Sequence, residues 1–354
     1  MTRFLHRLVT LVGLALLMAA CSQNKGDSIE SSSHRSVYYW KTTFNLSEQD
    51  LSFLEKHSID RIYLRMFDVD TKNDYVRDTH EVVPIATCSF DSAKPDSIEI
   101  VPTVFITLNA LRAYEGKESV LAGLITKRVL NMCSYNDLGP VTEIQFDCDW
   151  TESTRAMYVK LCKAAKDILH PQEICLSGTI RLHQVAEATY PFDKGVLMLY
   201  NTGAIKDPET SNSIIAYDDV KRYLGVKSRI EKFNKARKDN CPEIDFAYPT
   251  YCWNVAFTKD GRFDGILPML ELDGYPELKR HGNRYDVIEY CKIGSNYLFT
   301  GQTIRPEFAE YSEVAKVKNL VESTLGKTGS NILFHLDASN LSKYSDNEIE
   351  TILK

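Results

Sequence analysis

The chain has 354 residues, of which 44% are hydrophobic and 25% are charged, the proportions of a soluble globular protein. Its formal net charge of −6 gives no basis for expecting nucleic acid or an anionic membrane surface as a partner. None of its nine cysteines belongs to a Cys-x-x-Cys pair, so the sequence does not support zinc-ribbon or thioredoxin-type chemistry.

The first twenty residues have the pattern of a targeting segment. Arg3 and Arg7 supply a positive start, and residues 8–18 form an apolar centre that is too short to be a membrane anchor. The segment ends in small residues directly before Cys21, which resembles the processing site of bacterial lipoproteins. The resemblance implies cleavage before Cys21, lipidation of Cys21 and anchoring to the outer membrane of a Gram-negative bacterium. The alternative is an ordinary secretory signal.

Export also permits disulfide bonds. Cys148 and Cys175 lie in strand-like runs, where a buried free thiol is the commoner outcome. Cys241, Cys252 and Cys291 are the better disulfide candidates, and the sequence does not pair them.

Residues 21–36 are polar and rich in serine, which predicts a flexible tether, and residues 37–354 are predicted to form a single domain. Strand patterns occupy residues 37–40, 60–67, 98–108, 143–152, 173–180, 195–200, 244–251 and 332–336. A long polar loop is predicted from 68 to about 97. Helical patterns occupy residues 47–57, 118–133, 153–169, 217–238 and 346–353, with Ser47 as the N-cap of the first.

This alternation of strands and helices predicts a parallel sheet, and eight such units suit an α/β fold of the (β/α)8, TIM-barrel type. A doubly wound open sheet is the alternative, but no strand is followed by Gly-x-Gly-x-x-Gly, so no dinucleotide cofactor is predicted. Residues 256–329 are too many for a normal connection and are predicted to be an insertion between strands seven and eight. Asp260-Gly261 between Phe257 and Phe263 predicts a hairpin within it.

The fourth predicted strand carries an unusual polar face. Period-two alternation puts Glu143, Gln145, Asp147 and Asp149 on one face and Ile144, Phe146 and Cys148 on the other. A buried face with two aspartates is costly unless the charges are paired or hydrogen-bonded, which indicates a site. The alternative is an edge strand whose polar face is solvated.

Other predicted strands also end in polar, charged or aromatic residues. In (β/α)8 barrels the catalytic and binding residues lie at the carboxyl ends of the strands. These strand-end residues are Arg65, Asp68, Thr107, Asn109, Asp147, Asp149, Glu152, Arg181, His183, Tyr200, Asn201, Tyr251, Trp253, His335 and Asp337. Each also has a structural interpretation: Arg65 as the partner of the aspartates, the histidines as core residues, the aromatic residues as packing, and Glu152 as a first-turn helix residue favoured by the dipole.

Two of these strand ends resemble motifs of the family 18, chitinase-like glycoside hydrolases. Asp147-Cys148-Asp149-Trp150 resembles that family's fourth-strand Asp-x-x-Asp-x-Asp-x-Glu, and Met198-Leu199-Tyr200-Asn201 resembles its sixth-strand Met-x-Tyr-Asp. The resemblance implies a barrel that cleaves N-acetylglucosamine polymers, with the motif's final glutamate as the acid. Thr151 stands at that position and Glu152 comes one residue later, Ile144 replaces the first aspartate, and Asn201 replaces the last aspartate of the second motif.

A wider resemblance covers most of the chain after Cys21. The runs at residues 146–151, 179–184 and 248–253 are similar to those of uncharacterised barrel lipoproteins of Bacteroidetes-type bacteria. This resemblance does not imply any particular activity.

We therefore expect a lipoprotein that hydrolyses or processes a glycan with strand-end carboxylates. Asp149 or Glu152 would be the acid, its pKa raised by the neighbouring Asp147. Arg65, Arg181, His183 and Asn201 would bind polar groups of the sugar or another small polar ligand, while Tyr200, Tyr251 and Trp253 would stack on its rings.

Two alternatives remain open. The first is a non-catalytic glycan-binding or assembly lipoprotein, which Thr151 at the glutamate position motivates. The second is a metal hydrolase built on Asp68, Asp147, His183, His335 and Asp337. No His-x-His or His-Glu-x-x-His pair supports the second, so no metal and no other cofactor is predicted.

Overall fold

The computed structural model of the chain describes residues 34–354 with the exception of 75–78, 188, 242 and 328. The predicted leader, Cys21 and most of the predicted tether lie outside the described residues. Among the helices that are described, none combines the length and the apolar character of a membrane span.

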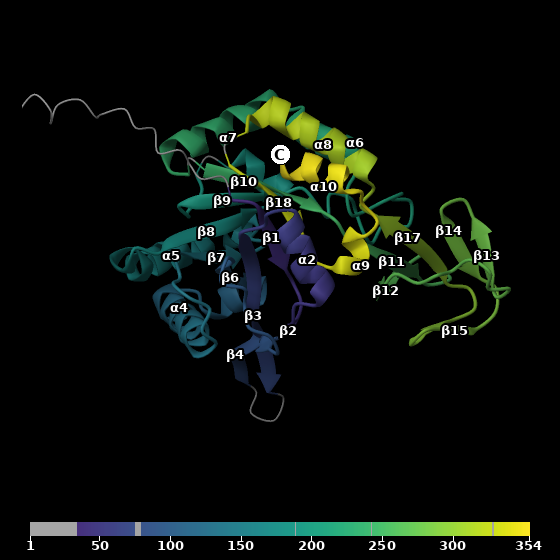
Figure 1. Cartoon of the computed structure of the whole chain (residues 1–354), viewed down its shortest axis with the longest axis horizontal. Coiled ribbons are helices and arrows are strands. Elements are labelled where there is room, and N and C mark those ends of the chain that lie inside the picture. The colour runs from purple at the N-terminus through teal and green to yellow at the C-terminus, as the bar shows by residue number, and fades with distance from the viewer. Residues whose placement is uncertain (1–33, 75–78, 188, 242, 328) are drawn as a thin grey trace, which may run out of the picture. The chain divides into compact units, whose positions relative to one another are not determined.

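Eight parallel strands form a closed barrel (Figure 1). They are β1 (Ser36–Tyr39), β3 (Arg61–Asp74), β6 (Glu99–Ile106), β7 (Glu143–Asp147), β8 (Cys175–Ile180), β9 (Lys194–Met198), β10 (Glu243–Pro249) and β18 (Asn331–Phe334). Each of these eight strands pairs with the barrel strand before it and the barrel strand after it in the sequence. The first strand, β1, closes the circle by pairing with both β3 and β18. The predicted (β/α)8 fold is confirmed, including an insertion between strands seven and eight.

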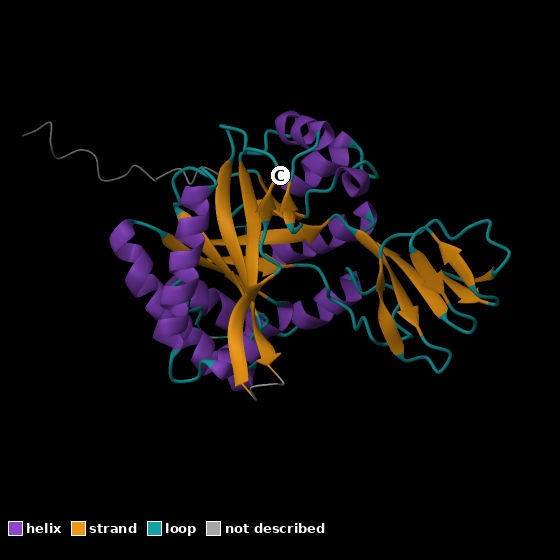
Figure 2. Cartoon of the chain, turned by 90° about the horizontal axis from the view of Figure 1, so that it is seen from below, coloured by secondary structure: helices purple, strands orange, loops and turns teal. Residues whose placement is uncertain are grey.

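Helices surround the barrel on its outer side (Figure 2). They are α2 (Glu48–Lys56), α3 (Leu108–Ala113), α4 (Glu118–Tyr135), α5 (Glu152–Leu169), α6 (Tyr217–Leu224), α7 (Lys227–Asp239), α8 (Tyr311–Leu325), α9 (Ala338–Leu341) and α10 (Asp346–Leu353). Ser47 caps α2 as predicted. Its hydroxyl accepts a hydrogen bond from the Asp50 backbone N–H at 3.1 Å, and the Asp50 carboxylate accepts a hydrogen bond from the Ser47 backbone N–H.

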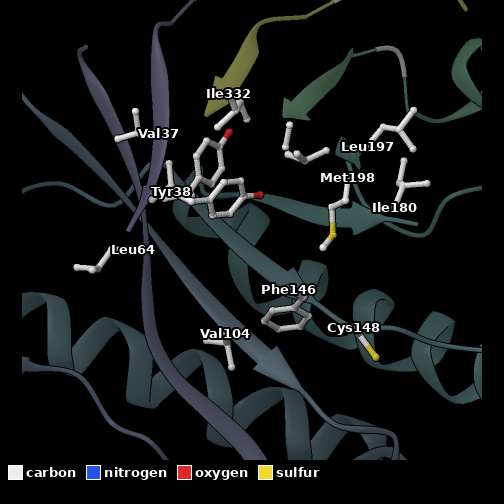
Figure 3. Close-up of a cluster of buried hydrophobic side chains, with 14 of the residues drawn as sticks. Val37, Tyr38, Leu64, Val104, Phe146, Cys148, Ile180, Leu197, Met198 and Ile332 are labelled. Atoms are coloured by element: carbon white, nitrogen blue, oxygen red, sulfur yellow. The ribbon is translucent and has the colours of Figure 1, made fainter. Parts of the chain in front are cut away.

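The alternation of side chains along each strand separates two regions. Outward-facing residues such as Leu64, Val104 and Phe146 fill the space under the helices, whereas Tyr38 and Met198 point into the barrel (Figure 3). The interior also holds polar side chains, because the Tyr38 hydroxyl donates a 2.8 Å hydrogen bond to the amide oxygen of Gln145. The predicted polar face of the fourth strand therefore lies inside the barrel.

The predicted polar loop after residue 67 is wrong. β3 continues to Asp74 and pairs with the antiparallel strand β4 (Thr79–Ile85) in a hairpin. Val69 is buried and Val82 packs on the core, but the sequence of residues 68–74 and 79–85 lacks the regular apolar alternation that identifies a buried strand. A short parallel pair, β2 (Thr43–Phe44) with β5 (Ser89–Phe90), ties the segments on either side of this hairpin together.

The insertion between β10 and β18 is a five-stranded antiparallel sheet with a core of its own (Figure 2). Its strands are β11 (Cys252–Phe257), β12 (Phe263–Leu267), β13 (Leu278–His281), β14 (Arg284–Val287) and β17 (Thr303–Phe308), and β15 (Cys291–Ile293) with β16 (Asn296–Leu298) adds a small hairpin. β11 and β12 are the hairpin expected around Asp260-Gly261, and Gly261 has the positive φ of 71° that its turn requires. After β17, helix α8 returns to the barrel.

All eight cysteines in the described part of the chain are free thiols. Cys148 is buried as predicted, although it lies one residue beyond the end of β7, and Cys175 is half-buried. Cys241, Cys252 and Cys291, the disulfide candidates, lie in three different elements or loops and are not paired.

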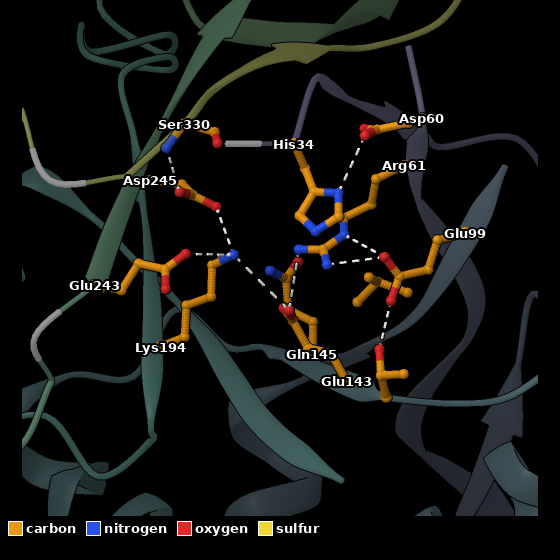
Figure 4. A network of polar contacts seen from close by, with 12 residues as sticks. His34, Asp60, Arg61, Glu99, Glu143, Gln145, Lys194, Glu243, Asp245 and Ser330 are labelled. Atoms are coloured by element: carbon orange, nitrogen blue, oxygen red, sulfur yellow. Dashed lines mark hydrogen bonds and ion pairs between the residues drawn. The ribbon is translucent and has the colours of Figure 1, made fainter. Parts of the chain in front are cut away.

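A cluster of charged residues fills the amino-terminal end of the barrel, which we call the base (Figure 4). The Lys194 ammonium lies 3.0 Å from carboxylate oxygens of both Glu243 and Asp245 and 3.9 Å from Glu143. Burial alone lowers the pKa of Lys194, but the three negative charges outweigh burial and raise it above its usual value. Lys194 of β9 therefore connects the acidic side chains that β7 and β10 supply to the same small volume.

The rest of the base links three neighbouring strands of the barrel. Arg61 lies 2.8 Å from Glu99 and 3.6 Å from Glu143, and so connects β3 to β6 and β7. His34, the first described residue, contacts Asp60 at 3.2 Å beside this cluster. The described chain therefore begins at the base of the barrel.

Replacing Lys194 with Met should destabilise the barrel strongly, because buried Asp245 would lose its ion-pair partner and buried Glu143 would keep only Arg61 at 3.6 Å. We expect a loss of roughly 3–5 kcal/mol in the free energy of unfolding, measured by urea denaturation. Lys235→Met is the matched control, since Lys235 makes an exposed pair with Asp239 and its loss should cost less than about 1 kcal/mol. Equal effects of the two substitutions would contradict a structural role for the base.

Candidate functional site

The opposite, carboxyl-terminal end of the barrel, which we call the mouth, brings together charged and aromatic side chains from several strands. Its residues are Trp40, Arg65, Asp68, Asp147, Asp149, Arg181, Tyr200, Tyr251, Trp253 and Phe334. Ion pairs and ring contacts connect all of them except Asp147, which interacts electrostatically with Asp149 and Arg181, so most of the predicted strand-end residues share one location.

Asp147, the last residue of β7, lies deepest among the acidic residues of the mouth and is 5% exposed. The Thr179 hydroxyl on the neighbouring strand donates a 2.7 Å hydrogen bond to it. Burial, followed by the charge of Asp149, raises the pKa of Asp147 to about 6, against the opposing effects of Arg181 and of the hydrogen bond from Thr179. Asp147 therefore exchanges a proton close to neutral pH.

Asp149 lies nearer to solvent and is held by Arg181. The two side chains face each other in a bidentate pair, with Arg181 Nη2 donating to Asp149 Oδ2 at 2.9 Å and Nε donating to Oδ1. The guanidinium also lies 6.0 Å from the centre of the Tyr200 ring. The sequence-based assignment placed the raised pKa on Asp149 or Glu152, whereas the structure raises the pKa of Asp147.

Arg65 makes a second arginine–aspartate pair at the mouth. Its Nε donates to Asp68 Oδ1 at 2.8 Å, and its Nη2 donates to Oδ2. The guanidinium lies 5.6 Å from the Trp40 ring centre. Arg65 thus neutralises Asp68 on its own strand, and Asp147 has neither arginine as a direct ion-pair partner among the described side chains.

The aromatic residues form a continuous wall. Tyr200 stacks on Phe334 with ring centres 4.4 Å apart, and Tyr251 contacts Tyr200 edge-on and Trp253 at 5.1 Å. Tyr200 and Tyr251 are buried, and the Tyr251 hydroxyl donates a 2.6 Å hydrogen bond to Asn201. Trp253 is only partly buried. Tyr200 and Tyr251 therefore pack and support the wall, whereas Trp253 and Phe334 are partly buried and keep some exposed ring surface.

Glu152 and His183 are not part of this set. β7 ends at Asp147, so the predicted strand to residue 152 is too long. Thr151 is instead the N-cap of α5, and its N–H donates a 3.0 Å hydrogen bond to Thr154. Glu152, the next residue, is exposed and has no hydrogen bond or ion pair with a described residue, while exposed His183 makes only a 3.5 Å contact with the Trp150 carbonyl.

The residues of the metal-hydrolase alternative are not gathered either. Asp337 caps α9 and pairs with Lys41, and burial lowers the pKa of His335. Within the described part of the chain, no three His, Cys, Asp or Glu side chains are arranged to hold a metal ion.

Sequence reasoning did not select Trp40, Phe334 or Glu307 as site residues. Trp40 and Phe334 follow or end the first and last strands, so the rule used for the other strand ends would have found them. Glu307 lies in the insertion, 54 positions from its partner Trp253 (2.7 Å from the indole nitrogen to the carboxylate), and no local pattern links the two.

No protein-family model and no curated protein matches the sequence. The fold is similar to that of a chitinase from Chromobacterium violaceum, with a TM-score of 0.51 and 12% identity over 91% of this chain and 98% of that chain. The spore cortex-lytic enzyme SleL of Bacillus megaterium aligns with a TM-score of 0.49 and 12% identity over 91% of this chain and 74% of that chain. The likeness to the chitinase is one of fold, a closed parallel barrel with surrounding helices.

The raised pKa of Asp147 should be visible in protein stability. Between its ordinary pKa of 3.8 and its folded value of about 6, the folded protein keeps a proton that the unfolded chain releases. The stability contributed by Asp147 is therefore full below about pH 4 and is lost as the pH rises to about 6.

Asp147→Asn, which keeps an oxygen for Thr179, removes this proton. Relative to the wild type, the variant should gain roughly 1–3 kcal/mol of stability between about pH 4 and pH 7. Urea unfolding at the two pH values measures this change. A difference that stays the same at both would mean that Asp147 titrates normally.

Proposed function

We propose that the protein is a glycan-processing hydrolase and that Asp147 is the acid that protonates the departing glycosidic oxygen. The observation that carries this proposal is the contrast between two neighbouring carboxyl groups. Asp147 is buried with a pKa of about 6, while Asp149 is more exposed and is paired with Arg181. Such a division between a proton-holding and an ionised carboxyl is the arrangement that glycoside hydrolysis uses.

In the proposed reaction, Asp147 gives its proton to the glycosidic oxygen as the bond between that oxygen and the anomeric carbon breaks. The negative charge of Asp149 stabilises the positive charge that develops on the sugar ring. Water then supplies the hydroxyl group to the anomeric carbon, and its remaining proton restores the acid form of Asp147. The products are two shorter glycans, one with a new reducing end.

The surroundings of the two carboxyls suit a sugar ligand. Trp253 presents ring surface for the apolar face of a pyranose ring. Arg181 and Arg65 each use two donor groups on an aspartate, which leaves further N–H groups for sugar hydroxyls. Each arginine is neutralised by its own aspartate, so the pairs favour an uncharged glycan.

Asp147→Asn should lower kcat for glycan cleavage by about 10²–10⁴-fold, because the amide has no proton of suitable acidity to donate. Wild-type activity should decline as the pH rises through about 6, since the acid must be protonated. The measurement is release of reducing ends from a panel of host and bacterial glycans.

Glu152→Gln is the matched control and should keep wild-type activity, since Glu152 lies outside the mouth. Loss of activity in Glu152→Gln together with an active Asp147→Asn would assign the acid to Glu152 instead.

A second function is favoured by one observation. Asp68 and Asp149 are each ion-paired with an arginine, and Thr151 stands at the position of the acid in the chitinase-like motif. Both features would suit a barrel that binds a glycan without cleaving it. Absence of turnover on the whole panel, together with glycan binding that Trp253→Ala abolishes, would establish this second function.

We also propose that Cys21 carries the lipid that anchors the protein to the outer membrane. The support is the sequence pattern of the leader, since Cys21 lies outside the described residues. Cells grown with an alkyne-labelled fatty acid should label the wild type and not Cys21→Ala. Labelling of both variants would show that the lipid, if present, is elsewhere.

A further inference from the structure

We propose that Glu307 of the inserted sheet is a positioning residue for the mouth. It fixes the direction of the Trp253 ring, and the buried Arg305–Glu307 pair ties the inserted sheet to the loop that carries Tyr200 and Asn201. The inserted sheet is then part of the ligand site, not a separate module. The ligand part of this inference rests on the proposed function, whereas the placement of Trp253 can be tested without any ligand.

Trp253 and Glu307 face each other across two antiparallel strands. Trp253 of β11 is directly paired with Glu307 of β17. The indole Nε1 donates a 2.7 Å hydrogen bond to Glu307 Oε2. Because the acceptor is a carboxylate whose side chain is 0% exposed, this bond is charge-assisted and shielded from water. Together with the Tyr251 ring at 5.1 Å, it restricts the orientation of the indole.

The Glu307 carboxylate has a complete set of partners. Arg305 Nε donates to its Oε1 at 2.7 Å, and the Ser213 hydroxyl donates to its Oε2 at 2.6 Å. The Arg305 side chain is also 0% exposed, so the positive and negative charges are buried together. The carboxylate therefore cannot rotate away from Trp253 without breaking three bonds.

Arg305 extends the same connection to the loop after β9. Its Nη1 donates to the Asp207 carbonyl at 2.8 Å, and its Nη2 donates to the Ile205 carbonyl at 3.1 Å. Ser213 belongs to the same loop, which runs from the end of β9 to α6 and begins with Tyr200 and Asn201. One buried ion pair thus joins Trp253, the inserted sheet and the loop at the mouth.

The inserted sheet has a source of stability apart from this pair. The sheet has its own apolar core, which includes Leu272, Tyr285 and Ile304. Apolar side chains in place of a buried ion pair are commonly as stable or more stable, because burying charges costs solvation energy. What the pair adds is a fixed acceptor for the indole, and a ring that must stack on a sugar benefits from a fixed direction.

The ligand-independent test uses protein labelled with ¹⁵N at tryptophan. The chain has three tryptophans, so three indole N–H signals are expected, and Trp253→Phe identifies that of residue 253. In the wild type this indole proton should exchange slowly with solvent. Glu307→Gln keeps an acceptor and should preserve the slow exchange, whereas Glu307→Ala should speed it at least tenfold.

The matched control is Glu99→Gln, which weakens the Arg61 pair at the base and should leave the Trp253 signal unchanged. A Trp253 signal that is the same in Glu307→Ala as in the wild type would overturn the positioning role. If Glu307→Ala does not fold, Glu307→Leu, which fills the same space without an acceptor, takes its place.

The functional test measures KM and kcat, or Kd if no turnover occurs, with chitotetraose and cellotetraose. Glu307→Ala should raise KM or Kd by about tenfold with kcat nearly unchanged, which is the loss expected for one well-placed ligand contact. Glu307→Gln should restore values close to the wild type. In the Trp253→Phe background, Glu307→Ala should have little further effect, because both changes act through the same bond.

Independent, multiplicative effects of the two substitutions would overturn the inference. If the wild type neither binds nor cleaves either tetrasaccharide, the glycan function is contradicted for these ligands. The tryptophan signals then still decide whether Glu307 positions Trp253.

Discussion

Closure of the sheet by β1 is the constraint on which the rest of the structure depends. Because β1 pairs with both β3 and β18, every barrel strand has two neighbours, and half of its side chains point into a narrow interior. Polar groups placed there can find partners only on the other strands. The interior accordingly holds a charged base around Lys194 and a charged mouth around Asp147. The first stabilises the closed circle, and the second uses the same confinement to alter the chemistry of a carboxyl group.

The mouth shows how a small difference in depth gives two aspartates different properties. Asp147 ends β7 inside the barrel, where burial favours its protonated form. Asp149 lies two residues later, nearer to solvent, where Arg181 can reach it with two hydrogen bonds. Neither arginine of the mouth neutralises Asp147 directly, since each already has an aspartate of its own. The acid–base character of the site therefore follows from how the ion pairs are distributed, as well as from which residues are present.

Much of this arrangement could be predicted from the sequence, because it depends on local patterns. The order of strands and helices and the inward face of residues 143–147 follow from alternation and periodicity. The place where β7 ends could not be read in this way, because Thr151 leaves the strand to cap α5. The β3–β4 hairpin was missed because its residues lack this alternation. The raised pKa of Asp147, the pairing of Asp149 with Arg181, and the link from Glu307 to Trp253 all depend on residues that are distant in sequence.

The position of His34 shows at which end of the barrel the described chain begins. His34 lies beside Asp60 at the base, where the parallel strands begin, whereas the site residues lie where the strands end. The first described residue and the mouth are therefore at opposite ends of the barrel. A tag joined directly to His34 would be attached at the base, away from Asp147 and Trp253.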